Sequence, residues 1–152
     1  SCLIKHPMVL TFGYGGFVRE ERQAIKERGL ESFFYYMPFE SNVAGAIKGL
    51  DVVTIPSLWE ACPLLPMEVL SCGTPLITTN CIGLREVVQG TPTTVIPIEN
   101  STVLAQALRL EMEVSTKDKF TAFQNTAINK FDVSVTIDKL LQVYDLMTYK
   151  QT

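Results

Sequence analysis

The 152-residue sequence lacks the features that mark several common classes of protein. No apolar run approaches the ~20 residues that a membrane-spanning helix needs. The four cysteines form neither a C-x-x-C pair nor a metal-ligand spacing, and the single histidine lies outside every motif. The net charge of −3 gives no electrostatic basis for binding nucleic acid. The sequence therefore predicts no zinc domain, no nucleic-acid partner and no transmembrane segment.

Cysteine usage and the first residues bear on the compartment. We expect the cysteines to be buried free thiols in a reducing cytoplasm. Residues 1–7 have neither the charged start nor the apolar core of a secretion signal. The missing initiator Met suggests a fragment or a processed start. We expect a cytoplasmic protein, with peripheral attachment to the inner face of the membrane as an option for the full-length form.

Short apolar runs alternate with amphipathic stretches along a chain that is 47% hydrophobic and 19% charged. The runs typical of buried strands cover residues 8–12, 33–36, 52–55, 76–79 and 94–96. Helical patterns follow over 17–28, 42–48, 63–73 and 85–89, and again over 101–113, 116–130 and 133–149. This order predicts an α/β fold, a doubly wound parallel sheet with a helical C-terminus, in one Rossmann-like domain of residues 1–152.

The stretch from Asp51 to Pro75 is the most informative part of the chain. Two carboxylates, Glu60 and Glu68, flank a helix that we predict to start near Pro63. Ligands of open parallel sheets bind outside the carboxyl ends of the strands, and free N–H groups at a helix start suit phosphate. The two acids can accept hydrogen bonds from hydroxyl groups on either side of a phosphate. A simpler interpretation is that the two acids are solvated side chains near the helix start, where the helix dipole favours negative charge.

A glycine turn follows the first apolar run. Gly13 and Gly15 form G-x-G after a predicted strand, which is typical of a dinucleotide site. The third glycine of that pattern would fall at Val18, and no acidic residue clearly ends the next strand. A tight turn that leads into a helix explains the glycines equally well.

Residues 56–88, PSLWEACPLLPMEVLSCGTPLITTNCIGLREVV, carry a family resemblance. They resemble the donor-site signature of the retaining, two-Rossmann-domain (GT-B) glycosyltransferases of group 1, from Pro56-Ser57 through the two acids to the segment at 82–88. The resemblance implies that Glu60 is the catalytic-site acid on the donor sugar and that Glu68 holds the ribose hydroxyls. The family often has Gly at the positions of Ala61 and Pro63. The other donor-binding positions that it implies are Cys62, Pro63, Leu64 and Leu65 at the diphosphate, Gly13 and Gly15 near the phosphates, and Tyr36 and Met37 beside the nucleobase.

The resemblance also implies a function. The chain would be the carboxyl-terminal donor domain of a bacterial hexosyltransferase that acts with retention in polysaccharide, lipopolysaccharide or O-antigen synthesis. Its donor would be a nucleotide sugar, with a UDP-sugar favoured over a GDP-sugar, and its acceptor a saccharide or lipid-linked saccharide. We expect no cofactor and no metal, and the sequence has no Asp-x-Asp.

The resemblance leaves part of the family's fold outside this chain. The first strand–helix unit, with its Arg and Lys, and the acceptor domain are missing, so we expect no transfer by the fragment alone. A non-catalytic Rossmann-like binding module is the alternative, and a dinucleotide oxidoreductase domain is a third hypothesis.

Overall fold

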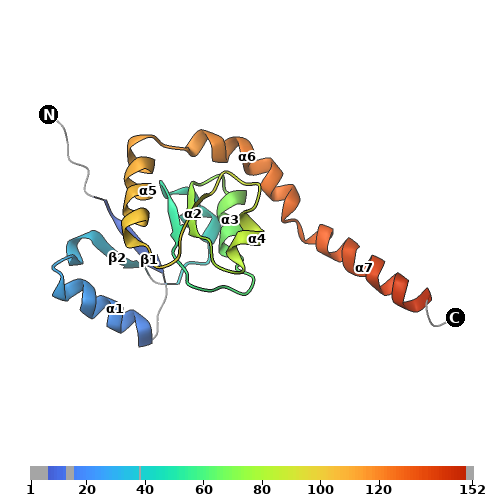
Figure 1. Ribbon diagram of the computed structural model, residues 1–152, viewed down its shortest axis with the longest axis horizontal. Coiled ribbons are helices and arrows are strands. Elements are labelled where there is room, and N and C mark those ends of the chain that lie inside the picture. Colours follow the sequence, from blue (N-terminus) through green and yellow to red (C-terminus); the bar gives the residue numbers. More distant parts are fainter. Residues whose placement is uncertain (1–6, 13–15, 38, 150–152) are drawn as a thin grey trace. The chain divides into compact units, whose positions relative to one another are not determined.

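The computed structural model describes residues 7–12, 16–37 and 39–149 (Figure 1). The chain divides into two compact units, Ser1–Val43 and Ala44–Thr152. The strands hydrogen-bond within these units as a two-stranded and a three-stranded sheet, and every pair is parallel. The predicted α/β class with parallel strands is therefore confirmed.

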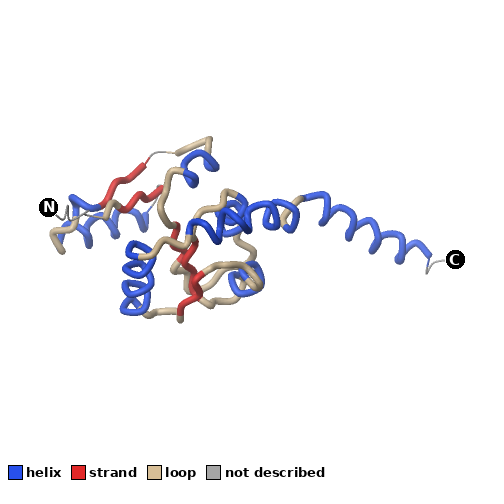
Figure 2. Tube along the Cα trace, turned by 90° about the horizontal axis from the view of Figure 1, so that it is seen from above, coloured by secondary structure: helices blue, strands red, loops and turns tan. Residues whose placement is uncertain are grey.

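The first unit is a single strand–helix–strand crossover. Strand β1 (Val9–Phe12) pairs in parallel with β2 (Phe34–Met37), and Figure 2 shows the two strands side by side. Helix α1 (Gly16–Glu27) and the short 3-10 helix η1 (Glu31–Phe33) connect them, as parallel pairing requires. The guanidinium of Arg22 on α1 lies 4.1 Å from the centroid of the Tyr36 ring, which fastens the helix to β2.

The second unit is built around a fully buried central strand. Strands β3 (Val53–Ile55), β4 (Leu76–Thr79) and β5 (Thr94–Ile96) lie in the order β3-β4-β5. All four residues of β4 are buried, as expected for an apolar run covered on both faces. The helices that alternate with these strands are α2 (Val43–Lys48), α3 (Leu65–Ser71) and α4 (Leu84–Val88).

Three helices complete the second unit, and their bounds agree with the sequence pattern to within one residue. They are α5 (Ser101–Glu113), α6 (Lys117–Lys130) and α7 (Val133–Tyr149). The Asn100 side chain caps α5 by accepting a hydrogen bond from the Val103 N–H at 3.0 Å. Across the residues that the structure describes, none of the helices combines the length and the apolarity needed to cross a bilayer.

Helix α6 belongs to the hydrophobic core, whereas α7 does not. Phe120 and Ala127 of α6 are fully buried in the cluster that also holds Val69 and Leu70 of α3. The Gln124 side chain adds a hydrogen bond of 3.0 Å to the Ser71 carbonyl at the end of α3. By contrast, α7 leaves most of its apolar side chains exposed, among them Ile137, Leu140, Leu141 and Tyr144.

Candidate functional site

The loop after β3, residues 56–64, carries Glu60 and lies against the next strand–helix connection. The Thr79 hydroxyl at the end of β4 donates a hydrogen bond to the Ser57 carbonyl. The Glu60 N–H donates to the Ile82 carbonyl at 3.2 Å. Within the loop, the Ser57 hydroxyl donates to Oε1 of Glu60 at 2.7 Å. Both the backbone and the carboxylate of Glu60 are therefore held in place.

Gly83 makes this close approach of two loops possible. Its φ of +87° lies in the region that favours glycine. A Cβ atom at this position would lie 2.8 Å from the carbonyl carbon of Glu60 and 3.0 Å from the Ala61 oxygen. The Gly83 N–H donates to Oε2 of Glu86 at 3.0 Å, which begins α4 with a capping-box contact. Only a residue without a side chain fits between α4 and the loop that carries Glu60.

Helix α3 begins slightly later than predicted. Leu64 is the N-cap and Leu65 the first helical residue, so Pro63 lies in the preceding loop and Pro66 is the proline of the first turn. Pro66 fits there because the first N–H groups of a helix have no intrahelical acceptor. The Glu68 N–H donates to the Leu64 carbonyl at 3.0 Å, which is the first intrahelical bond from this cap. The free N–H groups at Leu64 and Leu65 provide partial positive charge for an anion.

The two acids differ in their surroundings. Glu68 is exposed and stands at the end of the first turn of α3, rather than the turn and a half that a start at Pro63 would give. Glu60 is half-buried in the loop. Leu64 and Leu65, both exposed, lie between the two acids along the chain.

The three described cysteines are free, but only Cys81 is fully buried. Cys62 is exposed, contrary to the predicted burial, because it lies on the loop before α3 rather than on a packed element. Burial raises the pKa of the half-buried Cys72 thiol, Lys48 opposes this shift, and Glu68 one turn earlier adds to it. Cys72 and Cys81 therefore behave as packing residues.

The remaining predicted donor-site residues lie in the first unit or outside the described residues. Tyr36 is half-buried, with one face of its ring covered by Arg22, and Met37 at the end of β2 is exposed. Gly13 and Gly15 fall outside the described residues. Contact of Tyr36 and Met37 with a nucleobase, and of the glycines with phosphate, stays a prediction.

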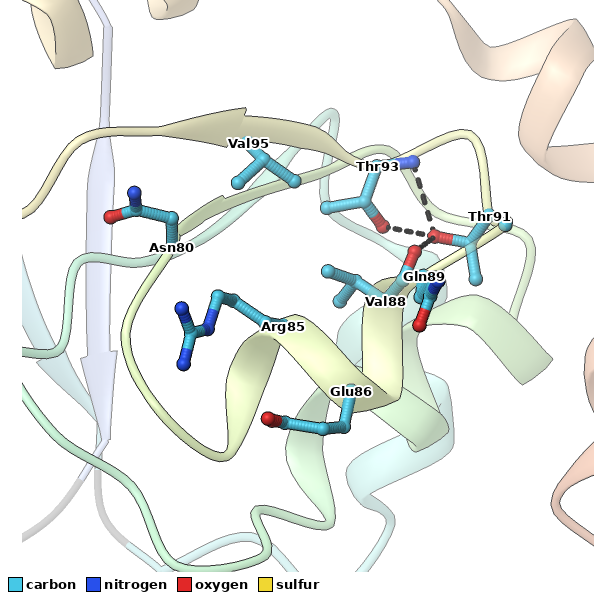
Figure 3. Close-up of a pocket in the computed structure, with 9 residues that line it drawn as sticks. Asn80, Arg85, Glu86, Val88, Gln89, Thr91, Thr93 and Val95 are labelled. Atoms are coloured by element: carbon cyan, nitrogen blue, oxygen red, sulfur yellow. Dashed lines mark hydrogen bonds between the residues drawn. The ribbon is translucent and has the colours of Figure 1, made fainter.

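An open hollow between α4 and β5 was not predicted from the sequence. It has a volume of about 480 Å³ and is lined by residues of α4, the turn from α4 to β5 and β5, together with Asn80 after β4 (Figure 3). The exposed Arg85 side chain extends towards Asn80 at the carboxyl end of β4, while hydrogen bonds of Thr91 close the opposite end. Arg85, Glu86 and Val88 of this surface belong to the segment at 82–88 that carries the family resemblance, whereas its threonines and Gln89 belong to ordinary turns.

Known proteins resemble this chain in sequence and in fold. A family model described as glycosyl transferases group 1 matches residues 5–112. The lipopolysaccharide core biosynthesis mannosyltransferase LpsB of Rhizobium meliloti is 26% identical over 74 residues, which are 49% of this chain and 21% of that protein.

Solved structures extend the likeness over nearly the whole chain. Anabaena Alr3699/HepE in complex with UDP-glucose has a TM-score of 0.79 at 24% identity, over 93% of this chain and 41% of that one. Sucrose-phosphate synthase of Thermosynechococcus elongatus has a TM-score of 0.86 at 18% identity, over 97% of this chain and 40% of that one. A glycosyltransferase of Rickettsia africae has a TM-score of 0.84 at 20% identity, over 95% of this chain and 41% of that one. The chain thus spans about two fifths of these structures, and the likeness confirms the predicted fold, half of a GT-B architecture.

Proposed function

The chain belongs to the group 1 glycosyl transferases, and we propose that it binds the nucleotide diphosphate sugar for retaining transfer of a hexose. The acceptor in this proposal is a saccharide or lipid-linked saccharide of bacterial surface polysaccharide synthesis. One observation supports the proposal: in the chain, Glu60 precedes and Glu68 follows the start of α3, in the segment that comes directly after the carboxyl end of β3. The UDP and UDP-glucose complexes of Alr3699/HepE support a UDP-sugar as donor, and the mannosyltransferase LpsB supports a lipopolysaccharide acceptor.

Each part of the segment has a separate task in this proposal. The N–H groups of Leu64 and Leu65 take up charge that develops on the diphosphate as the bond to the sugar breaks. Glu68, which is exposed, accepts hydrogen bonds from the ribose hydroxyls. Glu60 uses Oε1 for Ser57, so that Oε2 is directed to a hydroxyl of the sugar.

The proposed reaction has little need for a protein base. The acceptor hydroxyl attacks the anomeric carbon from the face that the diphosphate leaves, and a departing phosphate oxygen takes the acceptor's proton. The bond from the anomeric carbon to the acceptor oxygen replaces the bond to the diphosphate, which preserves the configuration. Stabilisation of the leaving charge is then the main contribution of this chain.

Titration of the 152-residue chain with UDP, GDP, NAD and inorganic diphosphate tests the proposal. We expect UDP to bind more tightly than NAD. Glu68→Ala should weaken UDP by roughly 10–100-fold, the equivalent of about 1.5–3 kcal/mol for hydrogen bonds to a charged group. Inorganic diphosphate should bind almost unchanged, because it has no ribose.

Glu113→Ala is the matched control, since Glu113 is an exposed glutamate on α5, outside the site. It should change neither affinity. If Glu68→Ala weakened the affinities for UDP and for diphosphate equally, Glu68 would not bind the ribose. Preference for NAD, or no nucleotide binding at all, would overturn the assignment of a donor site.

A further inference from the structure

We propose that Ser57 is a positioning residue that sets the carboxylate of Glu60 for the donor sugar, and that Thr79 holds Ser57 in turn. The inference rests on the proposed function of Glu60. It concerns recognition of the sugar, and leaves binding of the nucleotide to other groups.

The contact between Ser57 and Glu60 restricts the carboxylate directly. The Ser57 hydroxyl has one proton to donate, and it donates it to Oε1 of Glu60 at 2.7 Å. Both side chains are half-buried, so the bond is only partly exposed to competition from water. A glutamate without this bond would sample several rotamers, and ordering it on binding would cost side-chain entropy. The bond therefore selects one rotamer and leaves Oε2 to accept from a ligand.

Thr79 connects this pair to the core of the sheet. Its side chain is 2% exposed, and its hydroxyl donates to the Ser57 carbonyl. In the register of β3 and β4, Ile55 lies opposite Thr78, so Thr79 is the next residue beyond the last pair. Thr79 thus reaches past the carboxyl end of β3 and fastens the loop at the residue that orients Glu60.

The backbone of Glu60 is fixed independently of its side chain. Its N–H donates to the Ile82 carbonyl at 3.2 Å, and Gly83 packs against its carbonyl group. With the backbone fixed, the Ser57 hydroxyl controls mainly the side-chain torsions of Glu60. Removing that hydroxyl should loosen the carboxylate without displacing the loop, which separates positioning from folding.

The test compares four variants by their affinities for UDP and for UDP-glucose. Ser57→Ala and Thr79→Val should each lower the affinity for UDP-glucose about 3–10-fold and leave that for UDP within twofold, in line with the loss of one neutral hydrogen bond. Ser57→Thr should restore the affinity because it keeps the hydroxyl. Thr78→Val is the matched control: Thr78 is fully buried on the same strand, and its hydroxyl has no partner among the described residues.

A second readout needs no ligand. Side-chain three-bond couplings of Glu60, measured by NMR, should show one χ1 rotamer in the parent chain and averaging in Ser57→Ala and Thr79→Val. Unchanged couplings would overturn the inference whether or not nucleotide binds. Equal losses of UDP and UDP-glucose affinity in Ser57→Ala would do the same. Failure of the parent chain to bind UDP, with the expected couplings, would count against the proposed function and leave the positioning of Glu60 supported.

Discussion

Gly83→Ala should disturb the loop that carries Glu60, because Gly83 combines a positive φ with close contacts to the backbone of that loop. The φ of +87° forces an alanine into the left-handed region, at a cost of about 1–2 kcal/mol. The added Cβ would also lie 2.8 Å from the Glu60 carbonyl carbon and 3.0 Å from the Ala61 oxygen. These are backbone atoms, which cannot turn aside as a flexible side chain can. Either the loop or the start of α4 has to move.

Gly90→Ala separates the two contributions. Gly90 also has a positive φ, +74°, but a Cβ atom there would meet nothing within 4 Å. Gly90→Ala should therefore lower the free energy of unfolding by about 1–2 kcal/mol, the cost of placing an alanine in the left-handed region. Gly83→Ala should lower the free energy of unfolding by a further 1–3 kcal/mol or so, the usual range for overpacking. Urea unfolding followed by circular dichroism measures both free energies of unfolding.

Trp59 provides a local reporter of the loop. It is the single tryptophan of the sequence, and it directly precedes Glu60. We expect the folded-state emission of Trp59 to change in Gly83→Ala and to stay constant in Gly90→Ala. Equal losses of stability in the two variants, together with identical emission spectra, would show that Gly83 does not constrain the loop.

Two further predictions concern hydrogen bonds elsewhere in the second unit. Thr74→Val should lower the free energy of unfolding by about 1–3 kcal/mol in urea titrations, because it deletes a fully buried bond of 3.1 Å to the Ile47 carbonyl; a loss no larger than that of Thr78→Val would contradict this. Hydrogen bonds from Ser134 lower the pKa of Asp132 before α7. The unfolded chain then binds more protons, so this contribution is present above the ordinary aspartate pKa of about 3.9 and is lost as the pH falls through the lower folded value. Amide exchange of Ser134 should follow that loss, and an unchanged profile in Asp132→Asn would disprove the assignment.

Local patterns predicted most elements because their signals lie within the elements themselves. Strands β4 and β5 begin and end at the predicted residues, since an apolar run bounded by Gly, Pro and Asn leaves little choice of limits. The start of α3 differs from the prediction near Pro63 because two prolines, Pro63 and Pro66, each suit the first turn of a helix. The sequence cannot rank them without the packing that buries Pro66 and leaves Pro63 in the loop.

The sequence predicted that Glu60 lies on the loop after β3 and Glu68 on the helix that follows, but it did not predict the groups that hold Glu60. Thr79, on the next strand, donates a hydrogen bond to the Ser57 carbonyl, and Gly83, in the turn after that strand, packs against the Glu60 carbonyl group. Those contacts are tertiary, and no spacing within the loop records them. The exposure of Cys62 was missed for the same reason: its sequence neighbours are apolar, but they form a loop that does not pack against the core.

The segment that matches the family model ends before α6, although α6 is part of the hydrophobic core. The match to the family ends at residue 112, before α6 begins at Lys117. A protein shortened to that match would keep every described strand and both acids. It would nevertheless leave a hole where Phe120 stands and expose Leu70, on the helix that carries Glu68, to water. Any attempt to exchange this domain between transferases should therefore place its junction after α6.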